Sequence, residues 1–87
     1  MDKKYLATIT ILIKDRQNHA PEVNKILTDN GYLIIARLGV NLQKRCAENC
    51  TALITVVIEG NNKEIKKITD ELDKLYGIVA KVNIMTE

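Results

Sequence analysis

The stretch TALITVVIEG, residues 51–60, decides the fold of this chain because it has the pattern of a strand at the centre of a sheet. Its alternate side chains form one apolar set and one half-apolar set: Ala52, Ile54, Val56 and Ile58 against Leu53, Thr55, Val57 and Glu59. A strand with one solvated face should be polar on that side. We therefore expect both faces of this strand to contact other parts of a protein.

Residues 4–14 repeat this alternation and predict a first strand. Its two faces carry Ala7, Ile9, Ile11 and Ile13 on one side and Leu6, Thr8, Thr10 and Leu12 on the other. Two more strands are predicted over residues 32–40 and 78–85. In the stretch 32–40 the core-facing side is ambiguous, because two alternating apolar sets compete for it: Ile34, Ala36 and Leu38 against Leu33 and Ile35.

Helical spacing of apolar residues predicts a helix between the first two strands. Asp15 or Asn18 could cap its N-terminus, and Pro21 would be tolerated in its first turn. Gly31 follows at the position where a helix C-terminus favours a positive φ.

A second helix is predicted to follow the central strand. Asn61 and Glu64 have the spacing of a capping box, and Gly77 would end the helix. Two pairs of opposite charge are expected on its solvent face: Lys67–Glu71 and Asp70–Lys74.

The predicted order is therefore strand, helix, strand, strand, helix, strand within a single domain spanning residues 1–87. Two right-handed crossovers of this kind build a four-stranded antiparallel sheet with both helices on one face. We therefore predict an α+β, ferredoxin-like sandwich with the first and third strands in the middle of the sheet.

Composition argues against several classes of function. Hydrophobic residues make up 46% of the chain, with three Tyr and neither Trp nor Phe, so the core should be aliphatic. Thirteen basic and eleven acidic residues give a net charge of +2, and the basic positions are spread along the chain. Nucleic-acid surfaces concentrate Lys and Arg and often add aromatic side chains, so we do not expect direct nucleic-acid binding.

Neither the N-terminal stretch nor any other segment predicts membrane targeting. The stretch MDKKYLATITILIK has a basic start and an apolar run, but two threonines interrupt the run and no small-residue cleavage site follows. No apolar segment is long enough to span a bilayer. Two cysteines do not make a disulfide framework, so a cytoplasmic location is expected.

The face of the sheet without helices should carry an uncovered apolar patch. Its members are expected to be Leu6, Thr8, Thr10, Leu12, Leu53, Thr55 and Val57, with Val79 beside them and Lys81 towards the margin. Such a patch is unusual on a monomer, and self-association about a two-fold axis would cover it. We therefore predict a homodimer or homotetramer; a ligand bound on this face is the rival explanation.

Cys46 and Cys50 could supply part of a metal site or a redox pair. A closed zinc site needs four ligands, so two subunits would have to contribute one pair each. The alternative is structural, with one cysteine packed as a small apolar side chain. No cofactor is otherwise expected.

His19 and Arg37 are the other candidate functional residues. His19 could form an acid–base pair with Asp15 or Glu22, but no nucleophile lies close in sequence, and we expect no enzymatic activity. Arg37 interrupts an apolar run. It is either an edge-strand charge that discourages sheet extension or a contact for an anion or an interface.

The first half of the chain resembles the regulatory modules called ACT domains. The resemblance rests on the pattern I-L-I-K-D-R, then V-x-x-I-L and G-Y-x-I. It implies a ligand-binding loop after the first strand, at Asp15, Arg16, Asn18 and His19. The family's glycine after the Asp-Arg pair is absent here, since Gln17 follows Arg16.

A resemblance over nearly the whole chain is to the stand-alone iron-only hydrogenase system regulators, which are grouped with the C-terminal domain of the nickel-responsive repressor NikR. It rests on A-R-L-G-V at 36–40, A-L-I-T-V-V-I-E-G at 52–60 and G-I-V-A-K-V at 77–82. It implies an ACT-like oligomer with a regulatory role in hydrogenase assembly or expression. Cys50 matches the repressor's cysteine position, but Leu42 and Lys44 stand where its strand histidines would lie, so nickel binding is not implied.

The resemblance therefore leads us to expect a non-enzymatic, oligomeric regulatory domain that binds a small ligand or a protein partner. A transcriptional role would require a partner or direct contacts, because the sequence has no ribbon-helix-helix segment. The alternative function is a metal- or thiol-responsive sensor that uses Cys46 and Cys50.

Overall fold

The computed structural model of the chain describes residues 3–42 and 50–86. The elements follow the predicted order: β1 (Tyr5–Ile13), α1 (Arg16–Asp29), a 3-10 turn η1 (Gly31–Leu33), β2 (Ile34–Asn41), β3 (Ala52–Gly60), α2 (Asn62–Asp73) and β4 (Ile78–Thr86). The strands form one four-stranded sheet in the order β2-β3-β1-β4, and every neighbouring pair is antiparallel. The prediction of a ferredoxin-like sandwich with β1 and β3 in the centre is confirmed.

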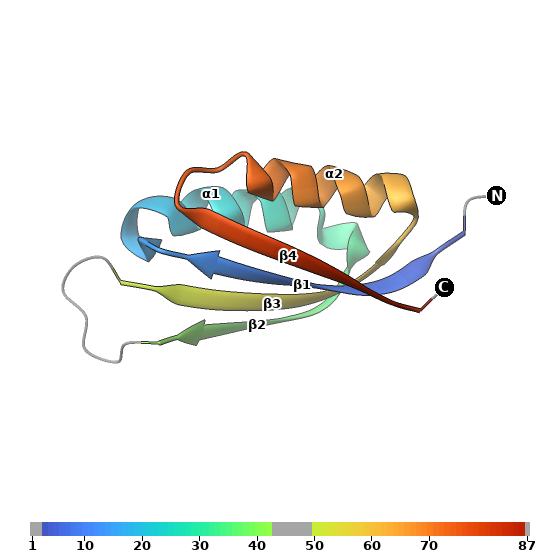
Figure 1. Cartoon of the computed structure of the whole chain (residues 1–87), viewed down its shortest axis with the longest axis horizontal. Helices are drawn as coiled ribbons and strands as arrows, with labels where there is room; N and C mark the ends of the chain where they lie inside the picture. The colour runs from blue at the N-terminus through green and yellow to red at the C-terminus, as the bar shows by residue number, and fades with distance from the viewer. Residues whose placement is uncertain (1–2, 43–49, 87) are drawn as a thin grey trace.

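Both helices cover the same face of the sheet (Figure 1). The side chains that alternate onto this face from the two central strands are almost fully buried, as the sequence predicts: Ala7, Ile9, Ile11, Ile13, Ala52, Ile54, Val56 and Ile58. From the helices, the core receives Val23, Leu27, Ile65, Ile68 and Leu72. The core is aliphatic, and no helix or strand within residues 3–42 and 50–86 covers the opposite face of the sheet.

Helix α1 begins directly after Asp15, one of the two N-cap positions predicted from the sequence. Asp15 is the N-cap, but its side chain makes no capping hydrogen bond and instead accepts one from Asn18 Nδ2 at 2.7 Å. Pro21 is the sixth residue of the helix, not a first-turn residue, and it leaves the Gln17 carbonyl without its usual helical donor. Near the other end, Lys25 Nζ donates to Asp29 Oδ2 at 2.8 Å; this hydrogen bond and the charge of Asp29 raise the pKa of Lys25.

The end of α1 also differs from the prediction of a positive φ at Gly31. Asn30 caps the helix with both its backbone N–H and its side-chain Nδ2, which donate to the Ile26 carbonyl at 3.1 and 2.8 Å. Gly31 then begins the 3-10 turn, and among residues 3–42 and 50–86 the positive-φ glycine is Gly77, with φ 77°. The chain therefore reverses through a 3-10 turn after α1 and through a left-handed glycine after α2.

The ambiguity over the second strand is resolved by a register shift between β2 and β3. Ile34 pairs with Ile58, but the next pair joins Ala36 to Val57, so Ile35 lies in an irregularity and is 61% exposed. Beyond this bulge Arg37 faces the helices, because it pairs with the buried Val56. At this bulge the alternate side chains of β2 change the face of the sheet to which they point. This change is why two apolar sets are found in the sequence of the strand.

Helix α2 matches its sequence signals closely. The Asn61 side chain accepts from Glu64 N at 2.8 Å and Glu64 Oε1 accepts from Asn61 N at 3.0 Å, which confirms the capping box. The predicted Lys67–Glu71 ion pair is present at 3.3 Å. Asp70, predicted to pair with Lys74, instead accepts from Lys66 at 3.1 Å.

Candidate functional site

The face of the sheet opposite the helices, here called the open face, presents its side chains in rows that run across all four strands. Residues that are partners in the strand pairing define the rows. The first row is Val40, Leu53, Leu12 and Val79; the second is Leu38, Thr55, Thr10 and Lys81; the third is Ala36, Val57, Thr8 and Asn83. All seven residues predicted for this patch therefore lie on one face, with Leu6 next to Glu59 at its far end.

Apolar character on the open face is graded from one end to the other. The first row consists of four aliphatic side chains, whereas the second and third rows mix threonine, lysine and asparagine with aliphatic residues. On the central strands these side chains are only half-buried, and on the edge strand β2 Leu38 is 65% exposed. Leu38 and Val40 also belong to this patch but could not be predicted from the sequence, because the bulge in β2 changes which side chains of this strand share a face.

The β1–α1 junction places the predicted ligand-binding residues on two sides of α1. Arg16 and Arg37 line a groove between α1 and the β2 edge of the sheet. Asp15 and His19 instead line a pocket beside the α2–β4 connection, and Asn18 is bonded to Asp15. The predicted set therefore does not form one site.

The groove between α1 and β2, here called the α1–β2 groove, has a volume of about 510 Å³. Its floor is apolar, and its polar side chains carry positive charge or none. The floor is formed by Ile13, Ala20, Ala52 and Ile54, and the polar lining by Arg16, Gln17, Asn24 and Arg37. No carboxylate is found among these lining residues of the described chain.

The two arginines of the α1–β2 groove are held differently. Arg37 Nη2 donates to Asn24 Oδ1 at 2.8 Å, which fixes the guanidinium of this edge-strand residue against the helix. Arg16 Nη1 is buried and has no hydrogen-bond partner within the part of the chain that the structure describes. The backbone N–H of Arg16 donates to the Cys50 carbonyl at 2.8 Å, which anchors the start of α1 to the segment before β3.

The pocket beside the α2–β4 connection is built around the imidazole of His19. The ring packs edge-on against Tyr76, with centroids 5.8 Å apart, and its Nδ1 lies 3.8 Å from Glu22 Oε1. A Cβ atom at Gly77 would lie 3.1 Å from His19 Cδ2, so the imidazole rests on the backbone of that turn. This close packing assigns His19 a structural contact with the turn after α2.

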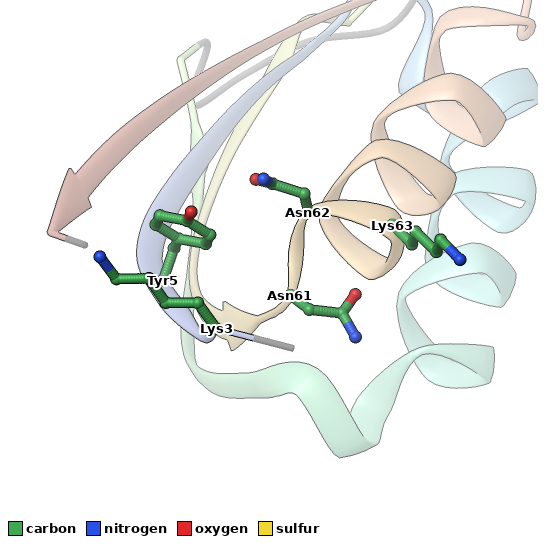
Figure 2. Close-up of a pocket in the computed structure, with 5 residues that line it drawn as sticks. All are labelled: Lys3, Tyr5, Asn61, Asn62 and Lys63. Carbon is green, nitrogen blue, oxygen red and sulfur yellow. The ribbon is translucent and has the colours of Figure 1, made fainter. Parts of the chain in front are cut away.

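A third, smaller pocket lies at the start of α2, as Figure 2 shows, with Lys3, Tyr5, Asn61, Asn62 and Lys63 around it. A helix N-terminus attracts anions through its free N–H groups and its dipole. Here the capping box already uses the N–H of Glu64, and the Glu64 carboxylate places a negative charge in the first turn. The pocket is therefore a weaker candidate for an anion than the α1–β2 groove.

The two cysteines are described unequally. Cys50 is fully buried and disulfide-bonded, whereas Cys46 lies outside the described residues. Within residues 3–42 and 50–86, no group of three or more His, Cys, Asp or Glu side chains is arranged to hold a metal ion. The described structure therefore does not complete the metal site considered from the sequence.

Solved structures with this fold place the chain among small α+β domains that include ACT and PII-like modules. The ACT domain of GTP pyrophosphokinase from Chlorobium tepidum is similar with a TM-score of 0.66 and 16% identity, over 97% of this chain and 89% of that one. A nitrogen regulatory PII-like protein, CPII from Thiomonas intermedia, solved with ADP, AMP and bicarbonate, has a TM-score of 0.59 and 16% identity, over 98% and 96% of the two chains. These likenesses define the class of fold.

The chain belongs to the TM1266-like family, described as "Iron-only hydrogenase system regulator, putative", whose model matches residues 5–82. The structure of the uncharacterized protein TM1266 from Thermotoga maritima is similar with a TM-score of 0.86 and 25% identity, over 97% of this chain and 100% of that one. The family expected from the sequence is therefore confirmed. No curated protein matches the chain, and no helix in the described ranges is long and apolar enough to cross a membrane.

Proposed function

We propose that this chain is a non-enzymatic regulatory domain of an iron-only hydrogenase system, and that it acts as a homo-oligomer assembled through the open face. The observation that carries the proposal is the row Val40, Leu53, Leu12 and Val79, which no element of the described chain covers. The family description supplies the regulatory role. An influence on transcription would be exerted through a partner protein, because the basic residues are dispersed.

The energetics favour a second copy of the chain as the cover for this row. Full burial of a leucine or valine side chain contributes about 1.5–3 kcal/mol, and these side chains are only partly buried in a single subunit. A two-fold axis brings the same row from each copy into contact, so each apolar side chain meets another. The polar rows beyond it would form a wetter margin, as is usual at the rim of an interface.

Size-exclusion chromatography with light scattering tests this assembly directly. The wild-type chain should have at least twice the monomer mass, and Leu53→Glu should shift it to the monomer mass because a carboxylate would be buried in the apolar row. Leu38→Glu should weaken assembly as well, and since Leu38 is 65% exposed the monomer should tolerate it. Thr28→Glu, on the exposed surface of α1, is the matched control and should leave the mass unchanged. A monomeric wild-type chain would rule out the proposed assembly.

A thiol- or metal-responsive sensor that uses Cys46 and Cys50 is the second candidate function. It is favoured by the position of Cys50, which is fully buried, disulfide-bonded and joined through its carbonyl to the first residue of α1. A change in the state of this sulfur would therefore reach the β1–α1 junction and the α1–β2 groove.

Reduction and metal analysis test the second candidate. A thiol reductant should change the oligomer mass or lower the unfolding midpoint of the wild-type chain, and a Cys46→Ser variant should show no further response. Protein purified without chelator should contain metal if the pair supplies ligands. If reduction changes neither property and no metal is bound, this candidate is excluded.

A further inference from the structure

We propose that the α1–β2 groove binds a small organic carboxylate with an aliphatic tail and no ammonium group. The inference rests on the proposed regulatory role, since it names the class of ligand to which the domain would respond. Its starting point is the presence of two guanidinium groups, Arg16 and Arg37, in one groove with an apolar floor. Two positive charges beside apolar side chains favour a ligand that has both an anionic group and an apolar part.

The chemistry of the lining selects a carboxylate as the charged group. Arginine presents paired N–H donors whose geometry matches a carboxylate, and such charge-assisted hydrogen bonds are among the stronger ones. Arg16 and Arg37 both line the groove, and none of its lining residues within the described ranges carries an acidic side chain that would repel an anion. Arg37 is already held by Asn24, so we assign the carboxylate to Arg16 and place Arg37 as a second positive charge on the edge strand.

The floor of the groove selects an aliphatic tail. Four aliphatic residues, Ile13, Ala20, Ala52 and Ile54, line the space between the arginines and the core. Arg16 and Asn24 are eight residues apart on α1, which corresponds to about 12 Å along the helix axis. A short unbranched chain extending from a carboxylate at Arg16 would therefore lie over apolar atoms.

The same lining argues against a free amino acid. An α-ammonium group needs a carboxylate or several carbonyl oxygens when it leaves water. Among the described residues, the polar lining offers two guanidinium groups and two amides, Gln17 and Asn24, and the Asn24 oxygen already accepts from Arg37. The groove therefore favours the carboxylate group of a free amino acid and disfavours its ammonium group.

Gly39 provides a way to close the groove without disturbing the fold. It lines the groove, and a Cβ atom built there would have no atom within 4 Å. A leucine at this position would project into the open space where the tail is expected. Gly31 is equally unobstructed and does not line the groove, so Gly31→Leu is a matched control for Gly39→Leu.

Isothermal titration of the wild-type chain with hexanoate tests the proposal, with hexanamide, leucine and inorganic phosphate as comparison probes. Hexanoate should bind, and each comparison probe should bind about tenfold more weakly or worse, since each lacks the charge, adds the ammonium or lacks the tail. Arg16→Gln should weaken hexanoate binding about tenfold or more. Gly39→Leu should abolish it, whereas Gly31→Leu and Lys63→Gln should bind as the wild type does.

Several outcomes would overturn the proposal. They are an absence of hexanoate binding at millimolar concentration, equal binding of hexanamide, leucine or phosphate, and unchanged binding in Gly39→Leu. Circular dichroism of each variant shows whether it is folded. If Arg16→Gln does not fold, hexanoate binding to Gly39→Leu still tests the proposal. Light scattering separates the two proposals, because an assembled chain without hexanoate binding refutes only the ligand, and a monomer that binds hexanoate refutes only the assembly.

Discussion

At the scale of single residues, Asn30 shows how one polar side chain ends a helix inside the core. It is 1% exposed, its Nδ2 donates to the Ile26 carbonyl at 2.8 Å, and its Oδ1 is buried without a partner in the described chain. We expect Asn30→Ala to lower the free energy of unfolding by about 1 kcal/mol, the usual value of one such hydrogen bond.

Asn30→Asp should be more damaging, although it is close in shape. At neutral pH it would place a carboxylate against the Ile26 carbonyl with no donor nearby in the described structure. The expected loss is about 3 kcal/mol, because a buried unpaired charge costs more than a missing hydrogen bond. Urea unfolding of both variants measures the difference in their free energies of unfolding. Equal losses of stability would show that water reaches this site more readily than the burial of Asn30 indicates.

Gly77 and Gly31 form a second residue-scale comparison. Gly77 has φ 77° and little room beside His19, whereas a Cβ at Gly31 would meet nothing within 4 Å. Gly77→Ala should therefore destabilise the fold by about 2 kcal/mol, because a left-handed conformation and a close contact both oppose the methyl group. Gly31→Ala should be neutral or stabilising by about 0.5 kcal/mol, since it reduces the entropy of the unfolded chain. Thermal unfolding measures both changes, and a loss in Gly31→Ala as large as that in Gly77→Ala would contradict this account.

At the scale of elements, the two helices start in different ways. Asn61 caps α2 through a reciprocal pair of hydrogen bonds, whereas the Asp15 side chain makes none to the backbone of α1. Asn61→Ala should therefore cost about 1 kcal/mol of stability, and Asp15→Ala about 0.5 kcal/mol or less. Denaturant titration compares them directly, and an equal or larger loss for Asp15→Ala would reveal a role for Asp15 beyond the helix terminus.

Elements with strong local signals could be predicted from the sequence, and those governed by tertiary contacts could not. The capping box, the buried face of α2 and Gly77 follow from local spacing, and the structure has all three. The alternation of β2 could not be predicted, because it depends on a register shift against β3 at Ile35. Asp15 and Asn18 both have the side chain of an N-cap; Asp15 occupies the N-cap position of α1, but its side chain bonds to Asn18 and not to the helix backbone.

At the scale of the whole molecule, assembly through the open face predicts that stability depends on protein concentration. Association stabilises the folded state by mass action, so the unfolding midpoint of the wild type should rise across a roughly hundredfold range of chain concentration. Leu53→Glu should remove this dependence, and Thr28→Glu should retain it. Differential scanning calorimetry at several concentrations measures the effect, and a constant wild-type midpoint would contradict the assembly.

The candidate site is also a property of the whole molecule, which is why the sequence indicates its residues but not its arrangement. Arg16 and Arg37 are 21 residues apart and lie on different elements, and only the sheet order brings them to one groove. Asp15 and His19 lie within three residues of Arg16 in the sequence, yet they line a pocket on the other side of α1. Helical geometry separates near neighbours that a motif groups together.

The backbone at the β1–α1 junction is tied on both sides. Lys14 N donates to the Gly77 carbonyl at 3.0 Å, and Arg16 N donates to the Cys50 carbonyl at 2.8 Å, so this short connection is fastened to the segments that lead into β4 and β3. A displacement of the junction would therefore act directly on three of the four strands, β1, β3 and β4. Through these two hydrogen bonds, a structural change beside α1 would be transmitted across the sheet.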